Sequence, residues 1–289
     1  GAEVGIHLDL NFNFKTERYL QVVRALDDLG LIWFEIDLFD PSSLRRIRDA
    51  VRTPIASCES LYGLQGFKPY FEQYAMDVAI IDYRMGNLHS VQAACKKVGL
   101  SSVITADAEQ ILDSKIAILP GVGAFGKAMS HLAESGLDDC IIHFTESGRP
   151  FIGICLGLQL LFDQSEEFGS HKGLGLIKGT VKRFQFNNGN NIKYPVPQIG
   201  WNRVRQNNSS WENTLLRNNQ SYDFMYFVHS YYAEPEDDKV VLATTTYGDQ
   251  EYCSAIQSNN IFATQFHPEK SSATGMKIYE ELKFFLGNN

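Results

Sequence analysis

The sequence predicts an α/β protein in which strands of a parallel sheet are separated by helices. Two observations carry this prediction. Apolar strand-like segments alternate with helical segments at intervals of about 25 residues, a spacing that suits parallel strands joined by crossover helices. In addition, the strand-like segments 115–121 and 148–154 end in glycine-containing turns, as strands do where a sheet edge carries a site.

Residues 1–76 repeat a strand-then-helix rhythm. Pro41 stands near the start of the second expected helix, where its missing N–H costs nothing. The expected strands cover 4–10, 31–38 and 53–61, and the expected helices cover 16–30, 41–51 and 67–75.

From residue 77 the same rhythm continues and then gives way to short strands with period-two alternation. The first expected strands cover 77–83, 115–121 and 148–154, and the expected helices cover 89–99 and 156–164. Further strands are expected at 173–184, 194–204, 223–234, 239–248, 251–257 and 260–267, followed by an amphipathic helix at 274–287. The asparagine-rich stretches 187–191 and 206–210 are expected to be polar turns.

Composition excludes several classes of protein. The chain has 289 residues, 44% of them hydrophobic and 21% charged, which is ordinary for a globular protein with one large or two average domains. No apolar run approaches the roughly 20 residues that span a bilayer. The net charge of −8 argues against a nucleic-acid-binding surface. We therefore expect neither membrane nor nucleic acid as a partner.

The cysteines point to a reducing compartment. Their number is odd, their spacing is wide, and no CxxC pair or histidine pattern accompanies them, which argues against a disulfide framework and a zinc site. The N-terminal residues also lack the pattern of a secretory signal, so the cytoplasm is expected. The five cysteines are Cys58, Cys95, Cys140, Cys155 and Cys253.

The segment GICLG, residues 153–157, has the glycine-x-nucleophile-x-glycine spacing of a nucleophile elbow. Such a turn leads from a strand into a helix and exposes the central side chain at the helix N-terminus. The helix dipole there favours a thiolate, and the N–H of Leu156 can face a developing oxyanion. A buried cysteine is also a common core residue, so this pattern alone leaves both interpretations of Cys155 open.

Two further motifs can complete a catalytic site. In QFHPEKSS, residues 265–272, Pro268 favours an extended His267, so that His267 and Glu269 can project on a common side as a base and its orienting carboxylate. The loop PGVGAF, residues 120–125, follows a strand directly and can offer backbone N–H groups to an oxyanion, but it lacks the Gly-Lys-Ser/Thr of a phosphate loop. Taken singly, each motif is equally compatible with a surface turn.

Together, PGVGAF, GICLGLQLLF and QFHPEKS resemble the class I glutamine amidotransferases over nearly all of residues 77–289. Within that class, DYRMGNLHSV, KGLGLIKGTVKRF, PQIGWNRV and YFVHSYY resemble the glutaminase subunit of imidazole glycerol phosphate synthase. The resemblance implies a flavodoxin-like, three-layer αβα domain that hydrolyses glutamine and passes ammonia to a barrel-shaped cyclase subunit in histidine biosynthesis. It implies no cofactor.

The resemblance also implies roles for individual residues. Cys155 would be the nucleophile, His267 the acid and base, and Glu269 its orienting carboxylate. Val122, Gly123 and Leu156 match the oxyanion hole. The family's glutamine-binding positions match Gly123, Gln159, Ser230 and Tyr231. The positions near the cyclase interface and the ammonia passage match Asn87, Tyr226, Lys270 and Trp201.

Two positions depart from the common family pattern. Arg84 stands where glycine is usual, at the turn expected to face the cyclase, and Gln198 stands where histidine is frequent. PQIGWN also occurs in relatives that serve amidation of surface sugars, which leaves a sugar amidotransferase open as the ammonia acceptor. A catalytically silenced fusion acting as a binding module is a further alternative.

Residues 1–76 lie outside this resemblance. Asp9, Glu35 and Glu59 each stand at or near the end of an expected strand, 26 and 24 residues apart, as carboxylates do when a parallel barrel gathers ligands for magnesium. The segment resembles part of an enolase-superfamily barrel of the mandelate racemase-like kind. Three or four βα units cannot close an eight-stranded barrel, so we expect a truncated fragment without a working metal site. A magnesium-dependent lyase or racemase is the alternative. The expected domains are 1–76 and 77–289, with the strand at 77–83 in the second.

Overall fold

The computed structural model describes residues 6–11, 13–48, 50–57, 77–186 and 194–287, and statements on structure concern these residues. They divide into two compact units, Gly1–Met76 and Asp77–Asn289, called the first unit and the second unit below. The expected helix at 67–75 and the expected turn at 187–191 lie outside the described residues, as do Cys58 and Glu59.

The first unit is a small parallel sheet with helical crossovers, in the order β1-β2-β3. Its core is formed by Tyr19, Val23, Phe34, Leu44 and Ile47. Its strands are shorter than the sequence predicted, because three residue pairs connect β1 with β2 and two connect β2 with β3. The elements are β1 (Leu8–Asn11), α1 (Thr16–Leu26), η1 (Asp27–Leu29), β2 (Phe34–Ile36), α2 (Pro41–Arg48) and β3 (Ile55–Ala56).

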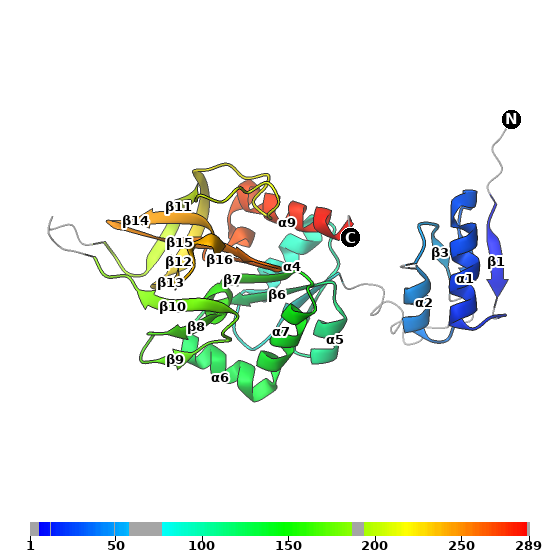
Figure 1. Ribbon diagram of the computed structural model, residues 1–289, viewed down its shortest axis with the longest axis horizontal. Helices are drawn as coiled ribbons and strands as arrows, with labels where there is room; N and C mark the ends of the chain where they lie inside the picture. The colour runs from blue at the N-terminus through cyan, green and yellow to red at the C-terminus, as the bar shows by residue number, and fades with distance from the viewer. Residues whose placement is uncertain (1–5, 12, 49, 58–76, 187–193, 288–289) are drawn as a thin grey trace. The chain divides into compact units, whose positions relative to one another are not determined.

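The second unit is larger and mixes parallel and antiparallel strands (Figure 1). Its first half comprises β4 (Val78–Ile81), α4 (Leu88–Lys97), β5 (Ser102–Thr105), α5 (Ala108–Asp113), β6 (Ile116–Gly121), α6 (Phe125–Ser135), α7 (Leu137–Glu146), β7 (Phe151–Cys155) and α8 (Leu156–Leu160). Its second half comprises β8 (Phe162–Ser165), β9 (His171–Lys172), β10 (Ile177–Arg183), β11 (Gln198–Gln206), β12 (Asp223–His229), β13 (Tyr231–Pro235), η3 (Asp238–Val240), β14 (Val241–Tyr247), β15 (Gln250–Ser258), β16 (Ile261–Thr264), η4 (Pro268–Lys270) and α9 (Ser272–Gly287).

A nine-stranded sheet organises the second unit, in the order β12-β11-β14-β15-β16-β7-β6-β4-β5. The five strands from β16 to β5 are parallel. Numbered along the chain, these five have the order 2-1-3-4-5 of a flavodoxin-like sheet, in which ligands bind beyond the carboxyl ends of the strands. A second sheet, β13-β10-β8-β9, extends the unit.

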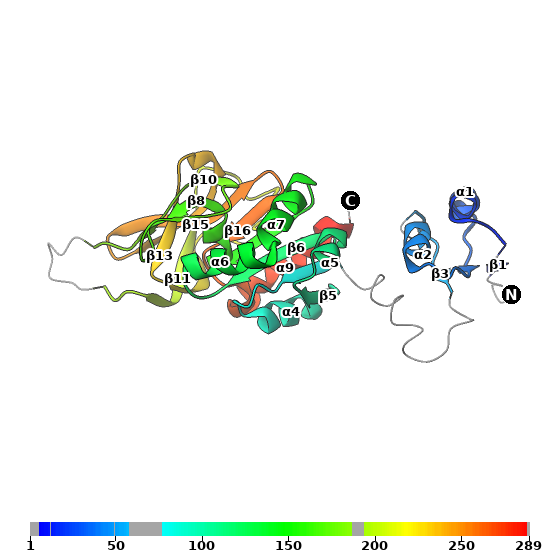
Figure 2. The same ribbon diagram turned by 90° about the horizontal axis from the view of Figure 1, so that it is seen from below.

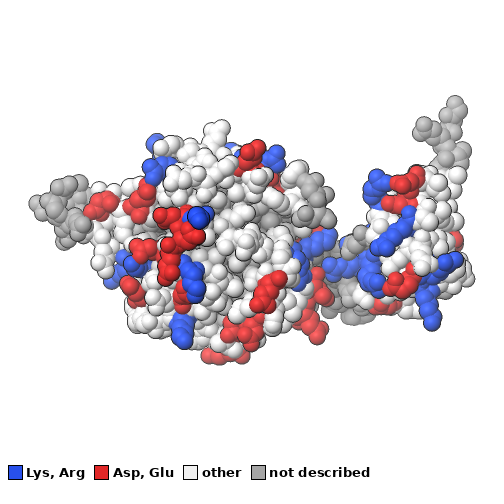
Figure 3. All heavy atoms as spheres, in the orientation of Figure 1, with Lys and Arg blue, Asp and Glu red and all other residues white. Residues whose placement is uncertain are grey.

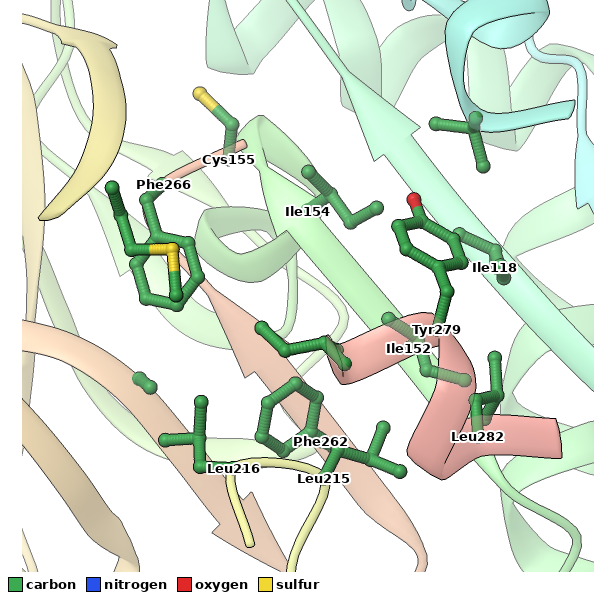
Figure 4. Packing of buried hydrophobic residues seen from close by; sticks show 14 of the residues in the cluster. Ile118, Ile152, Ile154, Cys155, Leu215, Leu216, Phe262, Phe266, Tyr279 and Leu282 are labelled. Atoms are coloured by element: carbon green, nitrogen blue, oxygen red, sulfur yellow. The ribbon is translucent and has the colours of Figure 1, made fainter. Parts of the chain in front are cut away.

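Helices cover both faces of the large sheet and form three layers (Figure 1). One core lies between the sheet and helices α4 and α9, and the other lies between the sheet and α5, α6 and α7. Figure 2 shows α6 and α7 on the near face when the molecule is seen from below. In the first core, Tyr279 and Leu282 of α9 pack on Ile118 and Ile152 of the central strands, and Cys155 lies at the end of this cluster (Figure 4).

Several elements differ from the sequence-based expectation. The expected helix 156–164 ends at Leu160, because Phe162 begins a strand that pairs with Ile177 of β10. The expected strand 223–234 is broken at Ser230 into β12 and β13, which belong to different sheets. Strand β5 and helices α5, α6 and α7 were not foreseen. The strand expected at 77–83 is β4, which pairs with β5 and β6 in the large sheet.

Charged side chains of both signs are interspersed on the face of the second unit that Figure 3 presents. None of the helices in the described part of the chain combines the length and the apolar character needed to cross a membrane.

Candidate active site

Cys155 lies at the junction of β7 and α8, at the carboxyl edge of the parallel strands. Its backbone has φ 56° and ψ −108°, a sparsely populated conformation for a residue with a side chain. Two glycines make this sharp turn possible. A Cβ atom on Gly157 would lie 1.8 Å from the Leu119 carbonyl oxygen, and one on Gly153 would lie 3.0 Å from the Gly157 backbone. Helix α8 has only five residues, so the expected dipole effect is confined to its first N–H groups.

His267 and Glu269 come together behind this turn. His267 is extended, with φ −101° and ψ 96°, as expected of a residue before proline. Its Nδ1 atom lies 2.8 Å from Glu269 Oε1, and both side chains are at most 2% exposed. The other ring nitrogen, Nε2, is buried and has no hydrogen-bond partner among the described residues, so it is available for proton transfer.

The charge state of His267 depends on its neighbours. Burial alone would lower its pKa, but the adjacent Cys155 sulfur and the Glu269 carboxylate outweigh burial and raise the pKa to about 10. A charged imidazole beside the Cys155 sulfur is an arrangement that would stabilise negative charge on that sulfur.

A pocket of ≈ 240 Å³ opens in front of Cys155. It contains all six residues that the resemblance matched to the oxyanion hole and to glutamine binding, which come from the loop after β6, from α8 and from the junction of β12 and β13. Gly123 has φ +120°, which only glycine adopts readily. The pocket is lined by Val122, Gly123, Cys155, Leu156, Gln159, Glu167, Pro197, Val228, His229, Ser230 and Tyr231.

Comparison with protein families agrees with this geometry. The family model described as "Glutamine amidotransferase class-I" matches residues 79–285. The chain belongs to this family. A second model, "Enolase C-terminal domain-like", matches residues 1–96 and overlaps the first over residues 79–96, which contain most of β4 and α4.

Individual amidotransferase relatives are closely similar. The "Imidazole glycerol phosphate synthase subunit HisH" of Syntrophotalea carbinolica is 47% identical over 204 residues, which cover 70% of this chain and 96% of the relative. The protein of the same name from Sulfurimonas denitrificans is 47% identical over 203 residues, 70% of this chain and 95% of the relative. The solved structure of PurLQS from Thermotoga maritima has a TM-score of 0.55 at 18% identity, covers 73% of this chain and 99% of that one, and shows the shared fold.

Three of the four interface candidates of this amidotransferase lie close together. The rings of Trp201 and Tyr226 are 6.1 Å apart edge to face, and Lys270 Nζ lies 6.0 Å from the centre of the Tyr226 ring. Trp201 is 50% exposed. Asn87 is the residue before α4 and makes no side-chain capping bond there.

The two departures from the family pattern differ in their surroundings. Arg84 is exposed and has φ 68°, so its backbone adopts the conformation for which glycine is usual, and its N–H donates to Asp82 Oδ1 at 2.9 Å. Gln198 is buried and accepts a hydrogen bond from the Tyr252 hydroxyl at 2.9 Å. The Gln198 side chain therefore belongs to the polar interior next to the pocket.

Sequence reasoning missed Glu167, His229 and Gln265. Glu167 lines the pocket, and its Oε2 atom accepts the Phe125 N–H at 2.6 Å, which fixes the carboxylate at the start of α6. His229 lines the pocket too, and burial lowers its pKa to about 4, so it is neutral. In the sequence, Glu167 is one of two adjacent glutamates in a polar turn, and no pattern distinguishes it.

Two of the three predicted metal-ligand candidates of the first unit, Asp9 and Glu35, lie in the described part of the chain. Asp9 and Glu35 are paired across β1 and β2, but Asp9 is exposed and accepts the Asn11 N–H at 2.8 Å. Glu59 lies outside the described residues. Within the described ranges of the chain, no three histidine, cysteine or acidic side chains gather as metal ligands do.

The packing of the elbow predicts a steep cost for Gly157→Ala. The added Cβ meets backbone that cannot move aside, so we expect a loss of about 3 kcal/mol or more in the free energy of unfolding, measured by urea denaturation. Gly148→Ala is the matched control, since Gly148 has φ +77° and no atom within 4 Å of an added Cβ. Its backbone strain should cost about 1–2 kcal/mol. Equal losses would contradict the packing argument.

The pKa of His267 predicts a pH-dependent stability difference between the wild type and Glu269→Gln. Because the folded pKa of about 10 lies above the ordinary value of 6.5, the bound proton stabilises the fold fully below pH 6.5, and this contribution is lost as the pH rises through 10. Urea denaturation at pH 6, 8 and 10 should show the wild-type advantage shrinking with pH. An advantage that stays constant would refute a charged His267.

Proposed function

We propose that this chain is the glutaminase subunit of an imidazole glycerol phosphate synthase, which hydrolyses glutamine to glutamate and ammonia and delivers the ammonia to a cyclase subunit in histidine biosynthesis. The observation that carries the proposal is the Cys155–His267–Glu269 arrangement beside an open pocket, in a chain 47% identical to a HisH protein over 96% of that protein. Such a subunit would work in the cytoplasm as half of a heterodimer.

The proposed first step is attack by the Cys155 thiolate on the side-chain amide carbon of glutamine. Charge then develops on the amide oxygen, where the N–H groups of Leu156 and of the Val122–Gly123 loop are available as donors. The His267 imidazolium donates its proton to the departing ammonia, and a glutamyl thioester remains.

In the second step, His267 takes a proton from water, and the resulting hydroxide attacks the thioester carbon. Glutamate leaves as the carbon–sulfur bond breaks, and Cys155 returns to the thiolate state. Glu269 keeps Nδ1 of the ring occupied throughout, so that Nε2 performs both transfers.

Glutamine would be held at both ends of the pocket. Gln159, Ser230 and Tyr231 surround the space in front of the thiol, and Glu167 offers the carboxylate that an α-ammonium group needs. The pocket therefore suits a short amino acid with an amide at one end and a cationic amine at the other.

The cyclase would dock on the outward face of β11 and β12, called the β11–β12 face below. Three cross-strand pairs form this face: Ile199 with Val228, Trp201 with Tyr226, and Arg203 with Phe224. Ile199 is 64% exposed and Phe224 is 48% exposed, and exposed apolar groups of this kind mark interaction sites. Val228 also lines the pocket, so ammonia released there would emerge at this face.

We assign the hydrolysis to residues 77–289 and regard residues 1–76 as an enolase-like barrel fragment. The overlap of the two family matches falls on β4 and α4. Strand β4 pairs with β5 on one side and β6 on the other, and both partners belong to the nine-stranded sheet. This pairing supports assigning β4 to the amidotransferase domain.

Replacement of the nucleophile tests the proposal. Cys155→Ser should lower glutamine hydrolysis at least about 10³-fold, measured as glutamate formed, with and without a cyclase subunit and its nucleotide ligand. Cys140→Ser, a buried cysteine on α7 distant from the pocket, should retain hydrolysis. Addition of the cyclase should raise the wild-type rate. Hydrolysis retained by Cys155→Ser would overturn the proposal.

The role of Glu167 gives a separate prediction. Glu167→Gln keeps the size of the side chain and removes the charge that pairs with the α-ammonium group, so KM for glutamine should rise about 10-fold or more, with a smaller change in kcat. Glu166→Gln is the control, because the adjacent Glu166 is exposed and does not line the pocket. Equal KM values for the two variants would exclude this contact.

A further inference from the structure

A chain of buried hydrogen bonds leads from the pocket wall to the Cys155 sulfur. Gln265, directly after β16, is fully buried, and its Nε2 atom donates to Cys155 Sγ at 3.6 Å. Its Oε1 atom accepts from Gln159 Nε2 at 3.0 Å. Gln159 Nε2 also donates to the main-chain oxygen of Tyr231 at 2.8 Å.

The hydrogen bonds themselves fix the orientation of both amides. A main-chain carbonyl can only accept, so the nitrogen of Gln159 must face Tyr231. The second hydrogen of that nitrogen then requires an acceptor, which is the oxygen of Gln265. The nitrogen of Gln265 consequently points at the sulfur, and this assignment does not depend on distinguishing oxygen from nitrogen by position alone.

The other titratable groups around the thiol cannot take the place of this donor. The Tyr252 hydroxyl donates to Gln198 Oε1 at 2.9 Å, and the Tyr83 hydroxyl has no hydrogen-bond partner among the described residues. The two ring nitrogens of His229 face the Tyr231 carbonyl and the Tyr252 hydroxyl. His229 is neutral because burial lowers its pKa to about 4. Glu167, across the pocket, accepts the Phe125 N–H instead. Within the described part of the chain, the Gln265 amide is therefore the side-chain group that donates a hydrogen bond to the sulfur, and the His267 ring lies beside it.

We infer that Gln265 is a further catalytic residue, whose amide N–H stabilises the thiolate of Cys155 and holds it at the base of the pocket. The inference rests on the proposed role of Cys155 as the nucleophile. His267 loses its proton to ammonia during the cycle, whereas an amide keeps its N–H groups in every step. Gln265 thus stabilises the sulfur when the thioester breaks and the negative charge returns to it.

The network also connects substrate binding with the nucleophile. Gln159 and the Tyr231 backbone line the pocket, and the same Gln159 amide orients Gln265. A glutamine molecule that contacts Gln159 would therefore touch a side chain that is linked to the sulfur through one other residue, Gln265.

The test is the pH dependence of Cys155 alkylation by iodoacetamide, followed by mass spectrometry of the peptide that contains Cys155, in the intact chain without glutamine or cyclase. Gln265→Met has nearly the same volume but no donor. The pH midpoint of alkylation should rise by about one unit, since a hydrogen bond to a charged group is worth about that shift. Gln257→Met, on the neighbouring strand β15 but at its far end, should leave the midpoint at the wild-type value.

A midpoint for Gln265→Met equal to that of Gln257→Met would overturn the inference, because a purely structural Gln265 would not affect the thiolate. If Gln265→Met does not fold, Gln159→Met serves instead: it frees the Gln265 amide to rotate, so the midpoint should rise, and an unchanged midpoint would overturn the inference. Glutamine hydrolysis is not part of this measurement. A shifted midpoint in a chain that never hydrolyses glutamine would refute the proposed function alone.

Discussion

The candidate site depends on the close approach of Gly157 to the carbonyl oxygen of Leu119. This oxygen occupies the space that the Cβ atom of any other residue at position 157 would need. Because Gly157 has no Cβ, α8 can pack directly against the end of β6, which brings Cys155 level with Gly121 of the paired strand. The strained backbone of Cys155 persists because packing on both sides holds it. Without that contact, the thiol and the glycine loop after β6 would not face one pocket.

The interior around Cys155 combines many polar atoms with few charges. The hydroxyls of Tyr83 and Tyr252 and the ring of His229 are buried as neutral groups, which avoids the large cost of burying isolated charge. His267 differs because the adjacent Cys155 sulfur and its ion-pair partner Glu269 raise its pKa to about 10. A low-dielectric setting strengthens the interactions of that one ion pair, and the amides of Gln159 and Gln265 orient it without adding charge.

Much of this arrangement could be predicted from local sequence. Glycine spacing around Cys155 and the His-Pro-Glu order at 267–269 fix short-range geometry, and the structure has both as expected. Glu167 could not be found in this way. The segment 156–164 contains no proline, so the sequence pattern extended the helix to 164, whereas pairing of Phe162 with Ile177 of β10 ends it early. Only that non-local pairing brings the turn with Glu167 back to the pocket.

The break at Ser230 has the same kind of cause. The segment 223–234 is rich in aromatic residues and contains neither proline nor glycine, so nothing local distinguishes one strand from two. Up to His229 the chain forms β12 and pairs with β11 in the large sheet. From Tyr231 it forms β13 and pairs with β10 in the small sheet. This change of sheet exposes the backbone of Ser230 and Tyr231 to the pocket, so a tertiary constraint creates the binding wall.

Strand β12 connects the outer face of the domain with His267 through the backbone of one residue. The Tyr226 carbonyl accepts the His267 N–H at 2.9 Å, and the Tyr226 N–H donates to Ser271 Oγ, which in turn donates to the His267 carbonyl. The ring of Tyr226 lies outside between Trp201 and Lys270. Cys155, by contrast, is fixed between the central parallel strands. β12 ends the sheet order, and a strand at a sheet edge yields more readily than one between two partners. A protein docked on the β11–β12 face would therefore act first on the position of His267, while Cys155 would stay in place.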